Sequence, residues 1–135
     1  MKLDVARFLE KAGIQPVILH EQADSGGTII EKFERHGANV GFAVILMSPD
    51  DVGSIKTERR KLRTRARQNV VLELGYFVGR LGRARVCVLV SGDIELPSDY
   101  VGVVYKKNES SGGWKIELAR ELDSAGFPVD LKAVL

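Results

Sequence analysis

Residues 41–47 read GFAVILM and residues 85–91 read RVCVLVS, and these two apolar runs decide the fold. Each run has the length of a β-strand, and neither shows the alternation of apolar and polar residues that a half-exposed strand would have. Continuous apolar runs of this length are typical of parallel strands covered on both faces. We therefore predict two buried strands at the centre of a sheet.

Helical patterns separate these runs. Apolar residues recur at helical spacing in residues 2–12, 28–35, 69–81 and 114–125, and shorter strands are expected at residues 16–20 and 101–105. Because parallel neighbours need crossover connections, the alternation predicts one α/β domain spanning residues 1–135, a doubly wound and mostly parallel sheet with helices on both faces. Ligands of such sheets bind beyond the carboxyl ends of the strands.

The composition narrows the class of protein. A net charge of +2 is too small to indicate a nucleic-acid partner, and the single cysteine, Cys87, forms no internal disulfide. No stretch reaches 18 apolar residues, and charged residues are interspersed among the first eleven positions. We expect a cytoplasmic protein without a membrane partner.

Glu73 is the most informative residue of the sequence. It is the only acid between residues 68 and 92, and leucines flank it on both sides. Helical spacing places it in one polar seam with Asn69, Tyr76 and Arg80. In such a seam a carboxylate can stabilise a developing cation while an amide and an aromatic hydroxyl orient a substrate. Spacing alone also allows a structural role, in which Glu73 pairs with an arginine or caps a backbone group.

Three other polar features carry weaker signals. The loop at residues 24–28, which includes Gly26 and Gly27, leads into a helix and suits either a helix cap or a phosphate site. Residues 56–67 hold seven basic residues and one acid, a pattern typical of a solvated, mobile connection, with Arg67 and the nearby Asn69 as exceptions. His20 and His36 lack metal-ligand spacing, so no metal site is expected. Trp114 is interpreted as a packing anchor.

Several segments match a known family. The chain resembles TIR-like domains of the bacterial predicted nucleotide-binding family, the effector domains of TIR-STING/CBASS and Pycsar systems. The resemblance rests on ARQNVVLELGYF at 66–77, GRLGR at 79–83, HEQ at 20–22, TIIEKF at 28–33, SPDDV at 48–52 and LPSDY at 96–100. It spans nearly the whole chain and implies a flavodoxin-like TIR fold. Family members begin with a strand that precedes the first helix of this sequence, so four strands are expected here.

The resemblance also implies a function. Family members hydrolyse NAD to nicotinamide and an ADP-ribose product in anti-phage defence, with NAD as a substrate rather than a cofactor. The catalytic glutamate corresponds to Glu73, and nucleotide contacts correspond to Asp50, Arg67 and Asn69. Tyr76, His20, Gly26 and Gly27 are further candidates for binding the substrate. The expected mechanism is dissociative cleavage of the bond between nicotinamide and ribose, with an ionised Glu73 beneath the oxocarbenium-like carbon.

The resemblance implies partners as well. Family members join the TIR domain to a cyclic-nucleotide sensor domain, which we do not expect within residues 1–135. We expect activity only when copies associate into an oligomer or filament. Two alternatives stay open: a non-catalytic TIR module that binds partners or nucleotides, and a nucleoside deoxyribosyltransferase-like enzyme.

Overall fold

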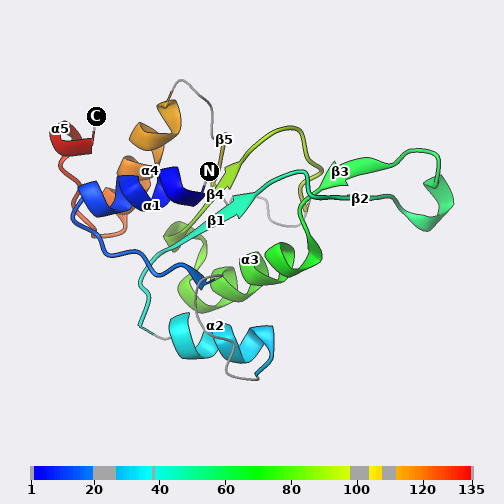
Figure 1. Ribbon diagram of the computed structural model, residues 1–135, viewed down its shortest axis with the longest axis horizontal. Helices are drawn as coiled ribbons and strands as arrows, with labels where there is room; N and C mark the ends of the chain where they lie inside the picture. Colours follow the sequence, from blue (N-terminus) through cyan, green and yellow to red (C-terminus); the bar gives the residue numbers. More distant parts are fainter. Residues whose placement is uncertain (1, 20–26, 38, 98–103, 108–111, 135) are drawn as a thin grey trace.

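A three-stranded parallel sheet forms the centre of the protein (Figure 1). The computed structural model describes residues 2–19, 27–37, 39–97, 104–107 and 112–134. The sheet consists of β1 (Ala43–Met47), β4 (Val86–Val90) and β5 (Val104–Lys107), in the order β1-β4-β5. Both apolar runs are therefore strands, as predicted, and the short strand expected at residues 101–105 begins at residue 104 within the described part of the chain.

Side chains of β1 and β4 alternate between two cores, one on each face of the sheet. On one face, Ala43, Ile45 and Met47 pack with Val70, Leu74 and Phe77 of α3 (Gln68–Leu81). The opposite face carries α1 (Lys2–Lys11) and α4 (Gly113–Ser124), which Figure 1 shows on the far side of the sheet from α3. All five residues of β4 are buried. Helices on both faces are thus confirmed, and they explain why neither strand alternates in polarity.

The second core is built around Trp114. Its ring lies 5.5 Å from that of Phe8 between centroids, and only 5% of the tryptophan is exposed. Leu118 and Leu122 of the same helix are buried beside Cys87 and Leu89 of β4. The interpretation of Trp114 as a packing anchor is confirmed.

The helix α2 (Ile29–Gly37) packs against α3 rather than against the sheet. Thr28 precedes it, and the Thr28 hydroxyl accepts a hydrogen bond of 3.2 Å from the backbone N–H of Glu31. Phe33 is buried, with its ring 5.5 Å from Tyr76 and 5.9 Å from Phe77. Thr28 therefore caps α2, which is one of the two roles that the sequence allowed for the loop at residues 24–28. Residues 24–26 of that loop lie outside the described residues.

The strand predicted at residues 16–20 is wrong for its described part. Residues 16–18 belong to no helix or strand, residue 19 is in a 3-10 turn, and His20 lies outside the described residues. Among the described strands β1 pairs only with β4, and residues 16–19 and β1 both line a cavity instead of forming a ladder with each other. The parallel sheet therefore has three strands in the described part of the chain, one fewer than expected.

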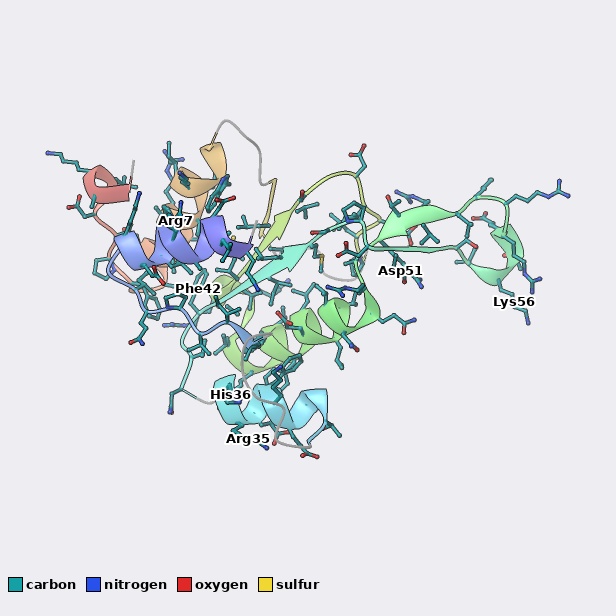
Figure 2. All side chains as sticks on the ribbon, in the orientation of Figure 1. Arg7, Arg35, His36, Phe42, Asp51 and Lys56 are labelled. Carbon is teal, nitrogen blue, oxygen red and sulfur yellow. The ribbon has the colours of Figure 1, made fainter. Side chains whose placement is uncertain are left out.

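The basic segment is an ordered arm and not the mobile connection that its charge pattern indicated. β2 (Asp51–Gly53) pairs antiparallel with β3 (Arg63–Arg65), and a 3-10 turn at Lys56–Glu58 lies near the tip. The arm projects away from the sheet (Figure 1), with Asp51 on its inner part and Lys56 near its outer end (Figure 2). The backbone N–H of Glu95 donates to the Thr64 carbonyl at 2.7 Å and so joins the base of the arm to the rest of the protein. Within the arm, Arg65 of β3 pairs with Asp51 of β2 at 3.0 Å.

Two short elements complete the described structure. A 3-10 turn at Arg83–Arg85 leads from α3 into β4, and α5 (Leu131–Val134) follows α4 near the end of the chain. Gly82, which ends α3, has φ of 86°, a left-handed value that glycine adopts without the steric cost of a side chain.

Candidate functional site

Helix α3 carries Glu73 to the boundary between the core and a cavity. Val70, Leu74 and Phe77 recur at helical spacing and are buried against the sheet. Glu73 precedes Leu74, so its side chain lies beside this apolar face and is half-buried. The helix begins at Gln68 because Arg67, its N-cap residue, has extended backbone angles (φ −60°, ψ 150°). The periodicity that fixes the buried face of α3 therefore also fixes the position of Glu73.

A cavity of about 690 Å³ runs along the outer edge of β1. At the carboxyl end of that strand its wall includes Ser48 and Asp50 from the loop after β1, and Arg67 and Glu73 from the start of α3. This is the edge of a parallel sheet where ligands are expected. The volume falls within the usual range for small-molecule sites, about 300–1,000 Å³.

Asp50 and Arg67 face each other across this end of the cavity. The Arg67 Nε lies 3.9 Å from the Asp50 Oδ2, at the limit of an ion pair, and their side chains are 66% and 48% exposed. An exposed pair at this distance contributes little to stability. Both groups are therefore available to a ligand: the guanidinium can bind a phosphate, and the carboxylate can accept hydrogen bonds from a sugar hydroxyl.

The carboxyl of Glu73 is desolvated by the residues packed around it. Burial raises the pKa of its carboxyl from 4.5 to about 7, because the charged form loses contact with water. None of the ion pairs between described residues includes Glu73, so no cation there offsets this cost. The alternative in which Glu73 is held in a salt bridge finds no partner among the described residues. Enzymes use burial beside a substrate cavity to raise the pKa of a catalytic carboxyl toward neutral pH. The position of Glu73 fits this arrangement.

This arrangement suits chemistry at a cationic centre. An ionised Glu73 at the cavity wall would attract positive charge that develops on a bound substrate, and the apolar neighbours Val70 and Phe77 would strengthen that attraction by excluding water. Arg67 is placed for an anionic part of the same substrate.

The remaining candidates of the polar seam lie elsewhere. Asn69 and Arg80 are exposed, and neither lines the cavity. Tyr76 points toward α2, where its ring contacts Phe33 and Phe77, and its hydroxyl is buried without a hydrogen-bond partner among the described residues. The structure therefore brings together Asp50, Arg67 and Glu73, and it leaves the other three outside that group.

The loop candidates are only partly described. Gly27 is half-buried and is not in the cavity wall, while His20 and Gly26 lie outside the described residues. Among the residues that the structure describes, no group of three or more His, Cys, Asp or Glu side chains could hold a metal ion. No described helix has the length and apolar character required to cross a membrane.

Sequence reasoning did not anticipate most of the cavity wall. The lining includes Pro16, Val17, Ile18 and Leu19 from one segment and residues 43–46 from another. Both segments were interpreted as strands, and neighbouring strands leave no cavity between them. To predict this cavity, one would need to know which strands are hydrogen-bonded neighbours. A single sequence does not show this.

Comparison with known proteins identifies the family of this chain. Residues 1–110 match the family model described as the TIR domain of CAP12/Pycsar effector proteins. This chain belongs to the CAP12/Pycsar TIR domain family. The resemblance seen in the sequence is thereby confirmed, and the parallel sheet with helices on both faces is the fold expected of a TIR domain.

Individual relatives of this TIR domain show the extent of the similarity. It is 52% identical over 126 residues to the uncharacterized protein YuaY of Escherichia coli, a match that covers 93% of this chain and 42% of YuaY. Protein tirC of Dictyostelium discoideum is 36% identical over 110 residues, covering 75% of this chain and 55% of tirC. The Pycsar effector protein PaPycTIR of Pseudomonas aeruginosa is 41% identical over 76 residues, covering 55% of this chain and 24% of the effector.

The TIR domain thus corresponds to part of longer relatives. It spans about two fifths of YuaY and just over half of tirC.

Proposed function

We propose that this TIR domain is an NAD glycohydrolase, which cleaves the bond between nicotinamide and ribose as the effector of an anti-phage system. The observation that carries the proposal is the position of Glu73, a desolvated carboxyl without a cationic partner among the described residues, in the wall of a cavity at the carboxyl end of β1. Membership of the CAP12/Pycsar TIR family supports the assignment of this site to a nucleotide.

Three side chains have separate roles in the proposed reaction. As the bond to nicotinamide breaks, positive charge develops on the ribose, and an ionised Glu73 stabilises that charge more than it stabilises the ground state. Arg67 binds the pyrophosphate, and Asp50 accepts hydrogen bonds from a ribose hydroxyl. Water then adds to the cationic carbon, which yields an ADP-ribose product and free nicotinamide.

The substrate itself would help to ionise Glu73. The nicotinamide ring of NAD carries a positive charge, and a cation within about 4–6 Å lowers the pKa of a neighbouring carboxyl. A carboxyl whose pKa lies at about 7 in the free protein would therefore become charged when NAD binds at physiological pH.

Release of nicotinamide from NAD tests this proposal. The protein is incubated with NAD at increasing protein concentration and with a crowding agent, because we expect turnover to require association of copies. Glu73→Gln should reduce release by at least about 100-fold, the size of effect seen when a group that stabilises transition-state charge is removed.

The exposed Glu58 provides a matched control, since it lies in the hairpin arm and outside the cavity wall. Glu58→Gln should leave the rate unchanged. Release that persists in Glu73→Gln would refute the role of Glu73, and no release under any condition would favour a non-catalytic TIR module. Transfer of a deoxyribosyl group from a deoxynucleoside to a free base would support the deoxyribosyltransferase alternative.

A further inference from the structure

The hairpin arm at residues 51–65 exposes three aliphatic side chains. Val52, Ile55 and Leu62 are 53%, 62% and 61% exposed. They make up three of the eight large hydrophobic side chains that are exposed among the described residues, although the arm is a short segment of the chain. Water is an unfavourable environment for aliphatic groups, and several of them together on one projecting element indicate contact with an apolar partner.

The outer end of the arm, residues 55–62, is strongly basic, and we call it the arm tip. Five exposed charged residues lie between its aliphatic ends, four of them cations: Lys56, Glu58, Arg59, Arg60 and Lys61. No ion pair between described residues includes any of these five side chains. The net charge of the whole chain is only +2, so positive charge is concentrated at the arm tip. Such a cluster attracts an anionic partner.

The backbone of the arm tip is ordered before any partner binds. The backbone N–H of Glu58 donates to the Ile55 carbonyl at 2.9 Å, and the backbone N–H of Lys61 donates to the Glu58 carbonyl at 2.9 Å. The paired strands β2 and β3 connect the arm tip to the sheet. Binding therefore requires little ordering of the main chain, which would otherwise weaken it.

The composition of the arm distinguishes between anionic partners. Single-stranded nucleic acids stack their bases on aromatic side chains, and residues 51–65 contain no Phe, Tyr or Trp. A nucleic acid duplex binds cations through its phosphates, but this contact leaves aliphatic side chains in water. Strand pairing with a second copy is disfavoured, because β2 and β3 have three residues each and β3 carries two arginines. An anionic bilayer has phosphates at its surface and an apolar layer directly beneath them.

We propose that the arm tip docks on an anionic lipid bilayer. Ile55 and Leu62 enter the boundary between headgroups and acyl chains, while the four cations bind lipid phosphates. The arm projects away from the sheet (Figure 1), so the arm tip reaches a bilayer before the sheet does. The sequence indicated no membrane partner because no apolar stretch has spanning length, but a contact confined to the headgroup region needs no such stretch. This docking is independent of the proposed reaction at Glu73.

Sedimentation with lipid vesicles tests this proposal without any measurement of activity. The 135-residue chain is mixed with vesicles of phosphatidylcholine that contain about one third phosphatidylserine, or with vesicles of phosphatidylcholine alone. We expect the protein to sediment with the anionic vesicles only. Binding should weaken when the salt concentration rises from about 0.1 M to about 0.5 M, because salt screens the attraction.

A charge-matched pair of double variants tests the cations. Each cation near an anionic bilayer strengthens binding about fivefold, so Arg59→Gln with Arg60→Gln should weaken binding at least about tenfold. Arg7→Gln with Lys11→Gln removes the same charge from exposed positions of α1. Figure 2 shows Arg7 at the opposite end of the molecule from Lys56. This control should weaken binding less than about threefold, because its charges lie beyond the range of screening.

A second matched pair tests the aliphatic side chains. Leu62→Ser should weaken binding to anionic vesicles at least about tenfold, since the leucine side chain loses its transfer into the apolar layer. Leu3→Ser changes a leucine of α1 that is 67% exposed, close to the 61% of Leu62, and should leave binding unchanged.

A fluorescent label reports whether the arm tip enters the bilayer. The only cysteine, Cys87, is fully buried, and Thr57 is exposed in the arm tip, so Thr57→Cys provides a single accessible thiol. An environment-sensitive dye at position 57 should shift its emission to shorter wavelength on anionic vesicles. The same dye attached through Lys11→Cys should show no shift.

Three outcomes would overturn the proposal. Equal sedimentation with anionic and neutral vesicles would show adhesion by apolar groups without recognition of lipid phosphates. Tighter binding to a DNA duplex than to anionic vesicles at the same salt concentration would identify nucleic acid as the partner. Vesicle binding that is unaffected by the changes at residues 59, 60 and 62 would place the contact outside the arm tip.

Discussion

Replacing Glu73 by glutamine should make the protein more stable at alkaline pH. Burial raises the pKa of Glu73 from 4.5 to about 7, so the folded protein binds this proton more tightly than the unfolded chain does. The stability that the protonated carboxyl provides is complete below about pH 4.5 and is lost as the pH rises through about 7. Glutamine is neutral at every pH and does not incur this loss.

The size of the effect follows from the pKa. A tenfold change in acidity corresponds to about 1.36 kcal/mol, so a rise from 4.5 to about 7 destabilises the folded protein by about 3 kcal/mol above pH 8. We expect the free energy of unfolding of Glu73→Gln to exceed that of the wild type by about 2–3 kcal/mol at pH 8.5. At pH 4 the two proteins should be equally stable.

Urea denaturation followed by circular dichroism at pH 4, 5.5, 7 and 8.5 measures this difference. Glu58→Gln, at an exposed position of the arm, should show no pH-dependent difference from the wild type. If Glu73→Gln has the same stability as the wild type at pH 8.5, then either water or a cation reaches the carboxyl. The electrostatic argument for the site would then be wrong.

Three further predictions concern the site and the packing around it. The value of kcat/KM for nicotinamide release should increase as the pH rises through about 7, because this ratio reports the ionisation of Glu73 in the free protein. A profile that is flat between pH 6 and 8 would contradict the role of an ionised Glu73. Leu118→Ala should lower the free energy of unfolding by about 2–5 kcal/mol in urea denaturation, since Leu118 is fully buried in the core around Trp114. A decrease below about 1 kcal/mol would show that the side chain is packed more loosely than the structure indicates. Gly41→Ala should cost about 1–3 kcal/mol, because its Cβ would come within 2.8 Å of the Phe127 ring, and an unchanged midpoint of thermal unfolding would show that Phe127 moves aside freely.

The elements near the site were predictable because their signals are local. Each of β1 and β4 is a short apolar run, and α3 has an apolar face with helical spacing, so periodicity alone located the three elements. Glu73 was a candidate for the same reason, as a lone acid on an apolar helix. The arm was missed because its two strands have only three residues each and carry charges that are typical of a solvated loop.

Periodicity could not determine which polar residues of α3 share a site. Asn69, Glu73 and Tyr76 lie on one seam of the helical wheel, yet only Glu73 reaches the cavity. The angle at which α3 crosses the sheet decides this, and that angle results from packing between side chains far apart in the sequence. The candidate roles of Asn69 and Tyr76 stay predictions.

Local residue patterns predicted β1, β4 and the helices α1 to α4, and they located an isolated carboxylate on a largely buried helix. The same patterns failed at residues 16–19 and in the arm. Within the described residues, packing between distant segments sets β1 at an edge of the parallel sheet and leaves a cavity lined by both β1 and residues 16–19. The physical reason is the range of the interactions. Backbone periodicity acts over a few neighbouring residues, whereas strand pairing and the desolvation of Glu73 depend on which distant segments approach each other when the chain folds.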